Sequence, residues 1–226
     1  PTVLTGLYSS PEAEEQDLNG LSIMTAGAPP APQVIRVIEG MGASIHHVYG
    51  LTETYGPFTV AAPQSDWDNL SVEERAKVKA RQGVPYLVYG TGVRVVDIDM
   101  NDVPRDAETM GEVVMHRGQV MNGYYKDTEA TEIAFRGGWF HSGDLAVWHP
   151  DGYIELQDRA KDIIISGGEN ISSQEVEKVM MEHPGVLEVC VVGVPDDHWG
   201  EVPKAFVIPR PNADVDEPEL IQFTRD

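Results

Sequence analysis

The segment that decides the fold is LSIMTAGAPPAPQVIRVIEGMGASIHHVYGLTETYG, residues 21–56. Alternating apolar residues over 21–25 predict a β-strand, which the glycine- and proline-rich run 26–30 interrupts. Apolar residues at helical spacing predict a helix over 31–39 that ends at Gly40, and residues 44–49 predict a second strand. A strand, a helix and a strand of these lengths indicate a parallel α/β unit.

Both predicted strands are followed by short motifs that suit a ligand site. Residues 27–29 follow the first strand and residues 50–53 follow the second. Ligands gather at the carboxyl ends of parallel strands, so the two motifs are expected at one edge of the sheet. The adjacent hydroxyl and carboxylate of Thr52 and Glu53 have two interpretations, a capped turn or a site for a phosphate and its metal ion.

The rest of the chain reads as three further regions. Residues 71–81 predict a surface helix with a capping box formed by Ser71 and Glu74. Residues 84–156 carry short alternating runs between turn residues and predict a β-rich subdomain, which includes a hairpin through the turn at 150–152. Residues 163–226 predict a separate small α+β module, with strands near 163–165, 186–194 and 205–208 and helices at 172–183 and from 217.

Composition excludes some classes of protein. The formal net charge of −21 argues against binding nucleic acid, whose phosphates need a basic face. No apolar run approaches the roughly 18 residues that a membrane helix needs. The single cysteine, Cys190, indicates a reducing, cytoplasmic compartment, and its valine neighbours predict a buried, inert thiol. His46 and His47 alternate along a strand, which favours packing over a shared metal.

Four segments, in this order and spacing, resemble the adenylate-forming superfamily of acyl-CoA synthetases, peptide-synthetase adenylation domains and luciferases. They are residues 26–29, 49–53, 141–144, and 158–162 together with 167–170. The resemblance extends over essentially the whole chain, and the run from Asn122 to Glu177 is most similar to short- or medium-chain and aryl acyl-CoA synthetases. The chain opens without a methionine and stops within a predicted helix, so we expect a fragment, and the resemblance implies that it is the C-terminal half of such a protein.

The resemblance implies a mixed α/β and α+β architecture with four parts. Residues 1–84 correspond to the α/β nucleotide-binding portion of the large domain, and residues 85–158 to its distorted β-barrel subdomain. Residues 159–161 correspond to a hinge, and residues 162–226 to a truncated small C-terminal domain. The family's phosphate loop and catalytic lysine would lie beyond the two ends, so the 226-residue chain alone is expected to be nearly inactive in adenylation.

The implied reaction is ATP-dependent activation of a fatty or aryl carboxylic acid to an acyl-adenylate, followed by transfer of the acyl group to coenzyme A. In this chemistry charge builds up on phosphate oxygens, so catalysis is mostly positioning and electrostatic stabilisation. The implied ligands are ATP or AMP, Mg²⁺ and CoA. The alternatives are an adenylation domain that loads a carrier protein and a non-catalytic interaction module of the same fold; a homo-oligomer is compatible with either.

By the resemblance, Thr52 would donate its hydroxyl to a phosphate and Glu53 would hold Mg²⁺. Asp144 would accept hydrogen bonds from both ribose hydroxyls, Arg159 would add a donor to the nucleotide, and Lys161 would be the hinge. The remaining implied residues line the adenine slot or the path of the phosphopantetheine arm: Gly27, Ala28, Pro29, Tyr49 and Gly50 for the former, Gly167 and Gly168 for the latter.

Overall fold

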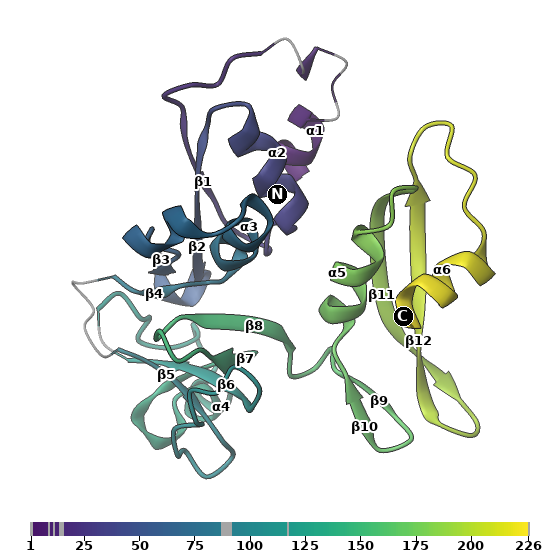
Figure 1. The fold of residues 1–226 in the computed structure, drawn as a ribbon. Helices are drawn as coiled ribbons and strands as arrows, with labels where there is room; N and C mark the ends of the chain where they lie inside the picture. Colours follow the sequence, from purple (N-terminus) through teal and green to yellow (C-terminus); the bar gives the residue numbers. More distant parts are fainter. Residues whose placement is uncertain are drawn as a thin grey trace. The chain divides into compact units, whose positions relative to one another are not determined.

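The computed structural model of the chain describes residues 2–8, 10, 12–13, 16–86, 92–116 and 118–225. The chain forms two compact units, Pro1–Leu156 and Gln157–Asp226 (Figure 1). The division falls within strand β8 (Ile154–Arg159), shortly before the predicted hinge at 159–161. The division of the large domain predicted near residue 84 lies inside the first unit, at the end of its first sheet.

The first sheet of the first unit contains the predicted strand–helix–strand. Strand β1 (Ser22–Thr25) pairs in parallel with β2 (Ser44–Leu51), and helix α2 (Pro32–Gly40) connects them. This parallel unit is part of a mixed sheet, because β3 (Gly56–Val60) and β4 (Val84–Pro85) extend the sheet in antiparallel pairing. The short connection after β2 explains this, since a tight turn returns the chain antiparallel to its own strand.

Helices cover this sheet through an apolar stripe. Val34, Ile35 and Ile38 of α2 are buried against Ile45 of β2, and helix α3 (Val72–Ala80) adds Ala76. Each such buried aliphatic side chain contributes on the order of 1.5–3 kcal/mol. The capping box at the start of α3 is confirmed, because the backbone N–H of Glu74 donates to the Ser71 hydroxyl and the Glu74 carboxylate accepts from the Ser71 N–H. The remaining elements are α1 (Thr2–Tyr8) and the 3₁₀ turns η2 (Thr52–Thr54) and η3 (Ser65–Asn69).

The second sheet of the first unit is the predicted β-rich region. Its strands are β5 (Val93–Val96), β6 (Met110–Met115), β7 (Phe140–Trp148) and β8, in that order, with helix α4 (Thr128–Ala134) and the 3₁₀ turn η5 (Arg136–Gly138) between β6 and β7. The predicted β7–β8 hairpin is confirmed, since the His149 N–H donates to the Tyr153 carbonyl. The core of this sheet also takes in Phe58 of β3, so the two sheets share apolar contacts.

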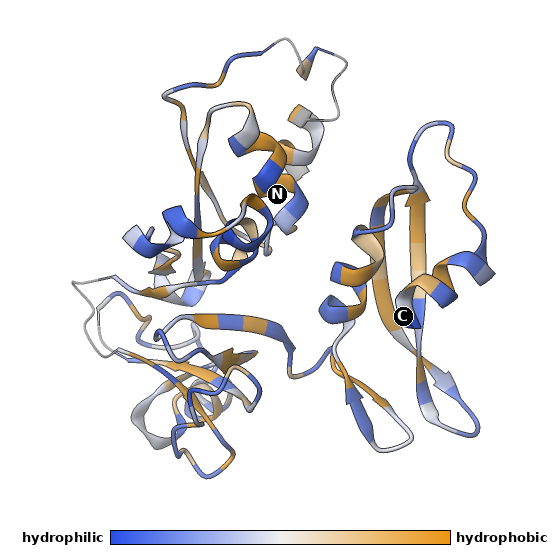
Figure 2. Cartoon of the chain, in the orientation of Figure 1, coloured by the Kyte–Doolittle hydropathy of each residue, from blue (hydrophilic) through white to orange (hydrophobic). Residues whose placement is uncertain are grey.

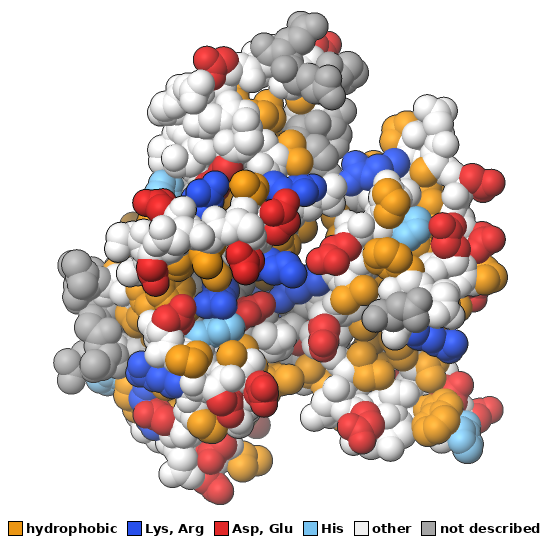
Figure 3. Space-filling view, viewed as in Figure 1, with side chains coloured by type: hydrophobic (Ala, Val, Ile, Leu, Met, Phe, Trp, Pro, Cys, Tyr) orange, Lys and Arg blue, Asp and Glu red, His pale blue; other side chains and the backbone are white. Residues whose placement is uncertain are grey.

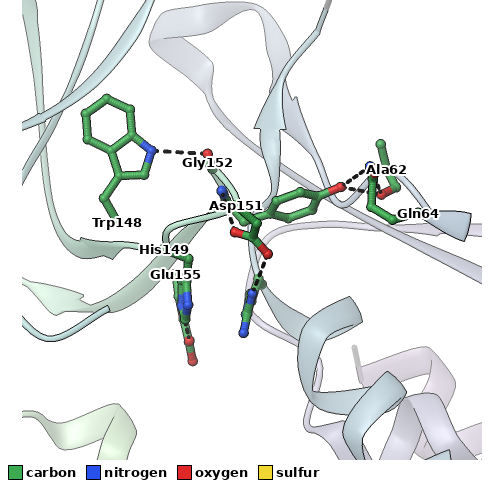
Figure 4. Close-up of polar contacts among 9 residues, drawn as sticks. Ala62, Gln64, Trp148, His149, Asp151, Gly152 and Glu155 are labelled. Atoms are coloured by element: carbon green, nitrogen blue, oxygen red, sulfur yellow. Dashed lines mark hydrogen bonds and ion pairs between the residues drawn. The ribbon is translucent and has the colours of Figure 1, made fainter. Parts of the chain in front are cut away.

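The turn of the β7–β8 hairpin joins the two sheets. The Tyr153 hydroxyl donates to the Ala62 carbonyl and contacts Gln64, as Figure 4 shows beside the Trp148–Gly152 and His149–Glu155 bonds. Close by, the Ile154 N–H donates to the Gly83 carbonyl at 2.9 Å. A Cβ at Gly83 would lie 1.9 Å from the Val60 carbonyl oxygen, and its φ is +84°. Only glycine therefore fits at this crossing.

The second unit is a four-stranded sheet with two helices. The strand order is β10 (Glu169–Ile171), β9 (Ile164–Ser166), β12 (Gly200–Pro209) and β11 (Val186–Asp196). Helices α5 (Ser173–Met181) and α6 (Glu217–Arg225) begin close to the predicted positions. Strands β11 and β12 are longer than predicted and run on through Pro195 and Pro203, which pair opposite Glu201 and Gly193.

The prediction that Cys190 is buried is wrong, because its side chain is exposed. Alternate residues of a strand point to opposite faces, and α5 and α6 pack on the face that carries Val191, where Met180 and Leu220 join it in the core. Cys190 lies on the other face, opposite Phe206, which is 56% exposed. The colouring in Figure 2 shows mostly apolar residues along β11 and β12. Because consecutive residues of a strand point to opposite faces, hydropathy alone does not reveal the buried face.

The described surface carries acidic, basic and apolar side chains side by side (Figure 3). Among the described residues, no helix has the length and apolarity needed to cross a membrane.

Candidate functional site

The turn after β2 is closed by a residue other than the predicted pair. The Thr54 side chain is fully buried, and its hydroxyl lies 2.9 Å from the Leu51 N–H and 2.8 Å from the Gly56 carbonyl oxygen. This bonding shapes η2 and leaves Thr52 exposed and Glu53 half-buried. The capped turn and the ligand site are therefore compatible, because different side chains serve them.

Gly50 is required by the sheet itself. A Cβ at this position would lie 2.1 Å from the Gly56 carbonyl oxygen, where the register of β2 and β3 shifts. A side chain here would push the two strands apart, which accounts for the glycine without a ligand. Its predicted close approach to a nucleotide stays a prediction.

Asp144 lies next to the end of β2. The Tyr49 hydroxyl donates to Asp144 Oδ2 at 2.6 Å, and both side chains are buried. Tyr49 is on β2 and Asp144 on β7, so the bond joins the two sheets of the first unit. Tyr49 precedes Glu53 by four residues in the sequence. Tyr49 also packs in the core of the second sheet, so its predicted stacking on adenine stays a prediction.

A carboxylate that sequence reasoning missed shapes the segment before Asp144. Glu112 of β6 accepts hydrogen bonds from His141 Nδ1 at 2.7 Å, from Arg136 Nη2 at 2.8 Å and from the Gly143 N–H at 3.1 Å. The Ser142 hydroxyl donates to the Val113 carbonyl at 2.6 Å. The register of β6 and β7 shifts at this point and Gly143 has a φ of +74°. The only sequence signal for this role was a charged residue within an apolar strand.

The motif after β1 is a turn on the same sheet edge as the end of β2. Gly27 has a φ of +92°, which disfavours other residues, although a Cβ there would meet no atom within 4 Å. Gly27 and Ala28 are exposed and Pro29 is half-buried. Since β1 and β2 are parallel neighbours, their carboxyl ends share one edge, as predicted.

The other predicted residues belong to the second unit. Arg159 and Lys161 are exposed. Gly167 and Gly168 form the two-residue turn between β9 and β10, with φ values of +60° and +90°, the combination that a type I′ turn requires. The Gly167 N–H donates to the Trp199 carbonyl at 2.8 Å, and a Cβ at Gly167 would lie 2.6 Å from the Trp199 ring.

The donor set suits a magnesium ion carried by a nucleotide better than a protein-only metal site. Among the described residues, no group of three or more His, Cys, Asp or Glu side chains could hold a metal ion. Mg²⁺ is usually bound through one or two carboxylates together with substrate phosphates and water. Glu53 is half-buried at the edge of the sheet, and its predicted role as such a carboxylate stays a prediction.

Comparison with known proteins gives two family matches. A family model described as AMP-binding enzyme matches residues 1–125, and one described as AMP-binding enzyme C-terminal domain matches residues 175–226. The acetate–CoA ligase CCL3 of Humulus lupulus is 50% identical over 224 residues, which is 98% of this chain and 39% of the relative. The 4-hydroxybutyrate–CoA ligase 2 of Metallosphaera sedula is 49% identical over 208 residues, 92% of this chain and 38% of the relative.

A solved structure shows the same arrangement of elements. The amide bond synthetase McbA from Marinactinospora thermotolerans has a TM-score of 0.84 and 31% identity, covering 100% of this chain and 44% of that one. The present chain thus spans about two fifths of the length of the curated relatives it matches.

Proposed function

The chain belongs to the family of AMP-binding enzymes, and from this premise we propose that the protein carrying it activates a carboxylic acid with ATP and transfers the acyl group to CoA. In the first step, a carboxylate oxygen of the acid bonds to the α-phosphorus of ATP, and pyrophosphate leaves with the electrons of the broken P–O bond. In the second step, the CoA sulfur bonds to the acyl carbon, its proton is lost, and AMP leaves.

The observation that carries this proposal is the bond between Tyr49 and Asp144. It brings β2, which Thr52 and Glu53 follow, beside the strand that bears Asp144, as a shared nucleotide would require. A carboxylate can accept about four hydrogen bonds, so the bond from Tyr49 is compatible with further bonds from ribose hydroxyls. Were the two motifs in separate places, they could not act on one nucleotide.

Under this proposal each residue keeps the role that the resemblance implies. Thr52 donates to a phosphate oxygen, Glu53 binds the Mg²⁺ that arrives with ATP, and Asp144 orients the ribose. Bound Mg²⁺ would neutralise part of the charge on the phosphates. In the second unit, Arg159 contacts the nucleotide, Lys161 acts as the hinge, and Gly167 and Gly168 leave room for the phosphopantetheine arm.

The acid is proposed to be short or medium in chain length, or aromatic. The names of the two relatives specify acetate and 4-hydroxybutyrate, which supports a small acid. CoA is the proposed acceptor because both names are those of CoA ligases. The likeness to an amide bond synthetase favours an amine as the competing acceptor, and a carrier protein is the other alternative.

The proposal is tested by measuring pyrophosphate release from ATP by the full-length protein with acetate, butyrate, benzoate and palmitate in turn. We expect release that depends on the acid, and product formation that requires CoA rather than an amine or a carrier protein. Asp144→Asn should raise the KM for ATP about 10- to 100-fold, as the loss of hydrogen bonds to a charged group implies. Nucleotide binding without pyrophosphate release by any acid would instead identify a non-catalytic module.

A further inference from the structure

Residues 118–124, which lie between β6 and α4, run across the turn that carries Glu53. We call residues 118–124 the strap. It makes one hydrogen bond to β3 and two to the turn. Gln119 Nε2 donates to the Pro57 carbonyl at 2.9 Å, the Met121 N–H to the Glu53 carbonyl at 2.7 Å, and the Tyr124 hydroxyl to Glu53 Oε1 at 3.1 Å. Glu53 is thus held by the strap at its backbone and at its carboxylate.

We propose that Tyr124 is a positioning residue for Glu53, and that the strap fixes this carboxylate in the orientation that binds the magnesium of Mg–ATP. The inference rests on the proposed function, because it takes Glu53 as the metal-binding residue. Groups that hydrogen-bond a metal ligand commonly set its orientation, and their loss lowers metal affinity.

The strap is itself anchored on helix α4. The Tyr124 N–H donates to the Thr131 hydroxyl at 2.9 Å, and that hydroxyl donates to the Asp127 carbonyl at 2.7 Å. Asp127 caps α4 by accepting from the Ala130 N–H at 3.0 Å. Gly123 has a φ of +149°, and a Cβ there would lie 2.7 Å from the Thr131 methyl. The backbone of Tyr124 is therefore anchored on α4 by bonds that are separate from the one its hydroxyl makes to Glu53.

The hydroxyl is well suited to hold a carboxylate. The phenol O–H of Tyr124 donates to the Glu53 carboxylate. A hydrogen bond to an ionised acceptor is stronger than one between neutral groups, so it can restrict the Glu53 side chain. A flexible glutamate would otherwise lose rotamer freedom when it bound the metal.

The next residue provides a matched control. Tyr125 is 88% exposed, and its ring lies 5.2 Å from Lys126 Nζ. Tyr125→Phe removes the same hydroxyl group as Tyr124→Phe, but from the neighbouring, exposed tyrosine.

The experiment uses calorimetry on the full-length protein to measure ATP binding, once with Mg²⁺ and once with EDTA. Tyr124→Phe should weaken binding of Mg–ATP about 10-fold and leave binding of metal-free ATP unchanged. Tyr125→Phe should alter neither. Glu53→Gln should abolish the advantage of magnesium, and adding Tyr124→Phe to it should cost nothing more, because coupled residues are not additive.

The outcomes separate the inference from the proposed function. If Glu53→Gln removes the magnesium effect and Tyr124→Phe does not reduce it, the positioning role is wrong and the metal role of Glu53 stands. If Glu53→Gln has no effect on magnesium dependence, the metal role and the positioning role both fail. If Tyr124→Phe weakens ATP binding equally with Mg²⁺ and with EDTA, Tyr124 supports the fold of the site and not the metal ligand.

Discussion

Glu53 and Asp144, in the first unit, each accept a hydrogen bond from a tyrosine far away along the chain, and Asp144 is buried. In the second unit, Arg159, Lys161 and the Gly167–Gly168 turn are exposed, and the turn is held chiefly by its own hairpin and by the neighbouring tip at Trp199. Bonds between distant segments fix a side chain more rigidly than a turn does, because several segments must move together to break them. The first unit thus holds its two carboxylates by bonds between distant segments, whereas the second unit leaves its glycine turn exposed.

The largest difference between the units is expected from adding one methyl group to a glycine. Gly83→Ala should destabilise the first unit by more than about 4 kcal/mol, since the positive φ and the overlap with the Val60 carbonyl add together. Gly168→Ala should cost the second unit only about 1–2 kcal/mol, since its φ is +90° and nothing lies within 4 Å. Hydrogen exchange measures the stability of each unit separately in the two variants. Equal losses of amide protection in the first unit of Gly83→Ala and the second unit of Gly168→Ala would contradict the expected difference.

A smaller effect is expected from the bond that joins the two sheets of the first unit. Tyr49→Phe should lower the free energy of unfolding by about 1.5–3 kcal/mol, as expected for a hydrogen bond to a charged group. Tyr55→Phe is the control, because Tyr55 lies at the end of the turn that follows β2 and is 87% exposed. Urea denaturation measures both variants. If the two lose the same stability, the Tyr49–Asp144 bond does not hold the sheets together.

The smallest effect concerns pH, and its sign should differ between the units. Burial lowers the pKa of His47, whose Nδ1 lies 2.8 Å from the Ala80 carbonyl oxygen, so the folded first unit binds fewer protons than the unfolded chain. Its stability should fall as pH drops below about 6.5, by at most about 1.4 kcal/mol per pH unit. Burial raises the pKa of Glu177, so the folded second unit binds more protons and its contribution should increase as pH falls towards 4.5.

Hydrogen exchange between pH 7 and pH 5, corrected for the intrinsic rate, tests this contrast. His47→Gln should flatten the pH dependence in the first unit, and Glu177→Gln should flatten it in the second. A pH dependence of the same sign in both units, unchanged by either substitution, would show that other groups govern their acid response.

Local signals in the sequence predicted the elements of the fold correctly. Apolar spacing located β1, α2 and β2, and the Ser71–Glu74 pair marked the start of α3. These predictions succeed because strands, helices and caps depend on residues within a few positions of one another. The same reasoning placed Thr52 and Glu53 at a strand end and Asp144 in a hairpin strand, as the structure has them.

Features that depend on distant partners could not be predicted in this way. Nothing near Glu53 in the sequence indicates that Tyr124 bonds to it, and nothing near Gly143 indicates that Glu112 does. The exposure of Cys190 follows from which face of β11 the helices cover, a choice that neighbouring valines do not record.

The sequence by itself therefore determined the order of the elements, the turns that need glycine and the family motifs. The tertiary structure alone decided which carboxylates are held, by which tyrosines, and which side of the small sheet is buried. The physical reason is range: backbone preferences act between neighbours in the chain, whereas hydrogen bonds such as Tyr49–Asp144 join residues that only folding brings together.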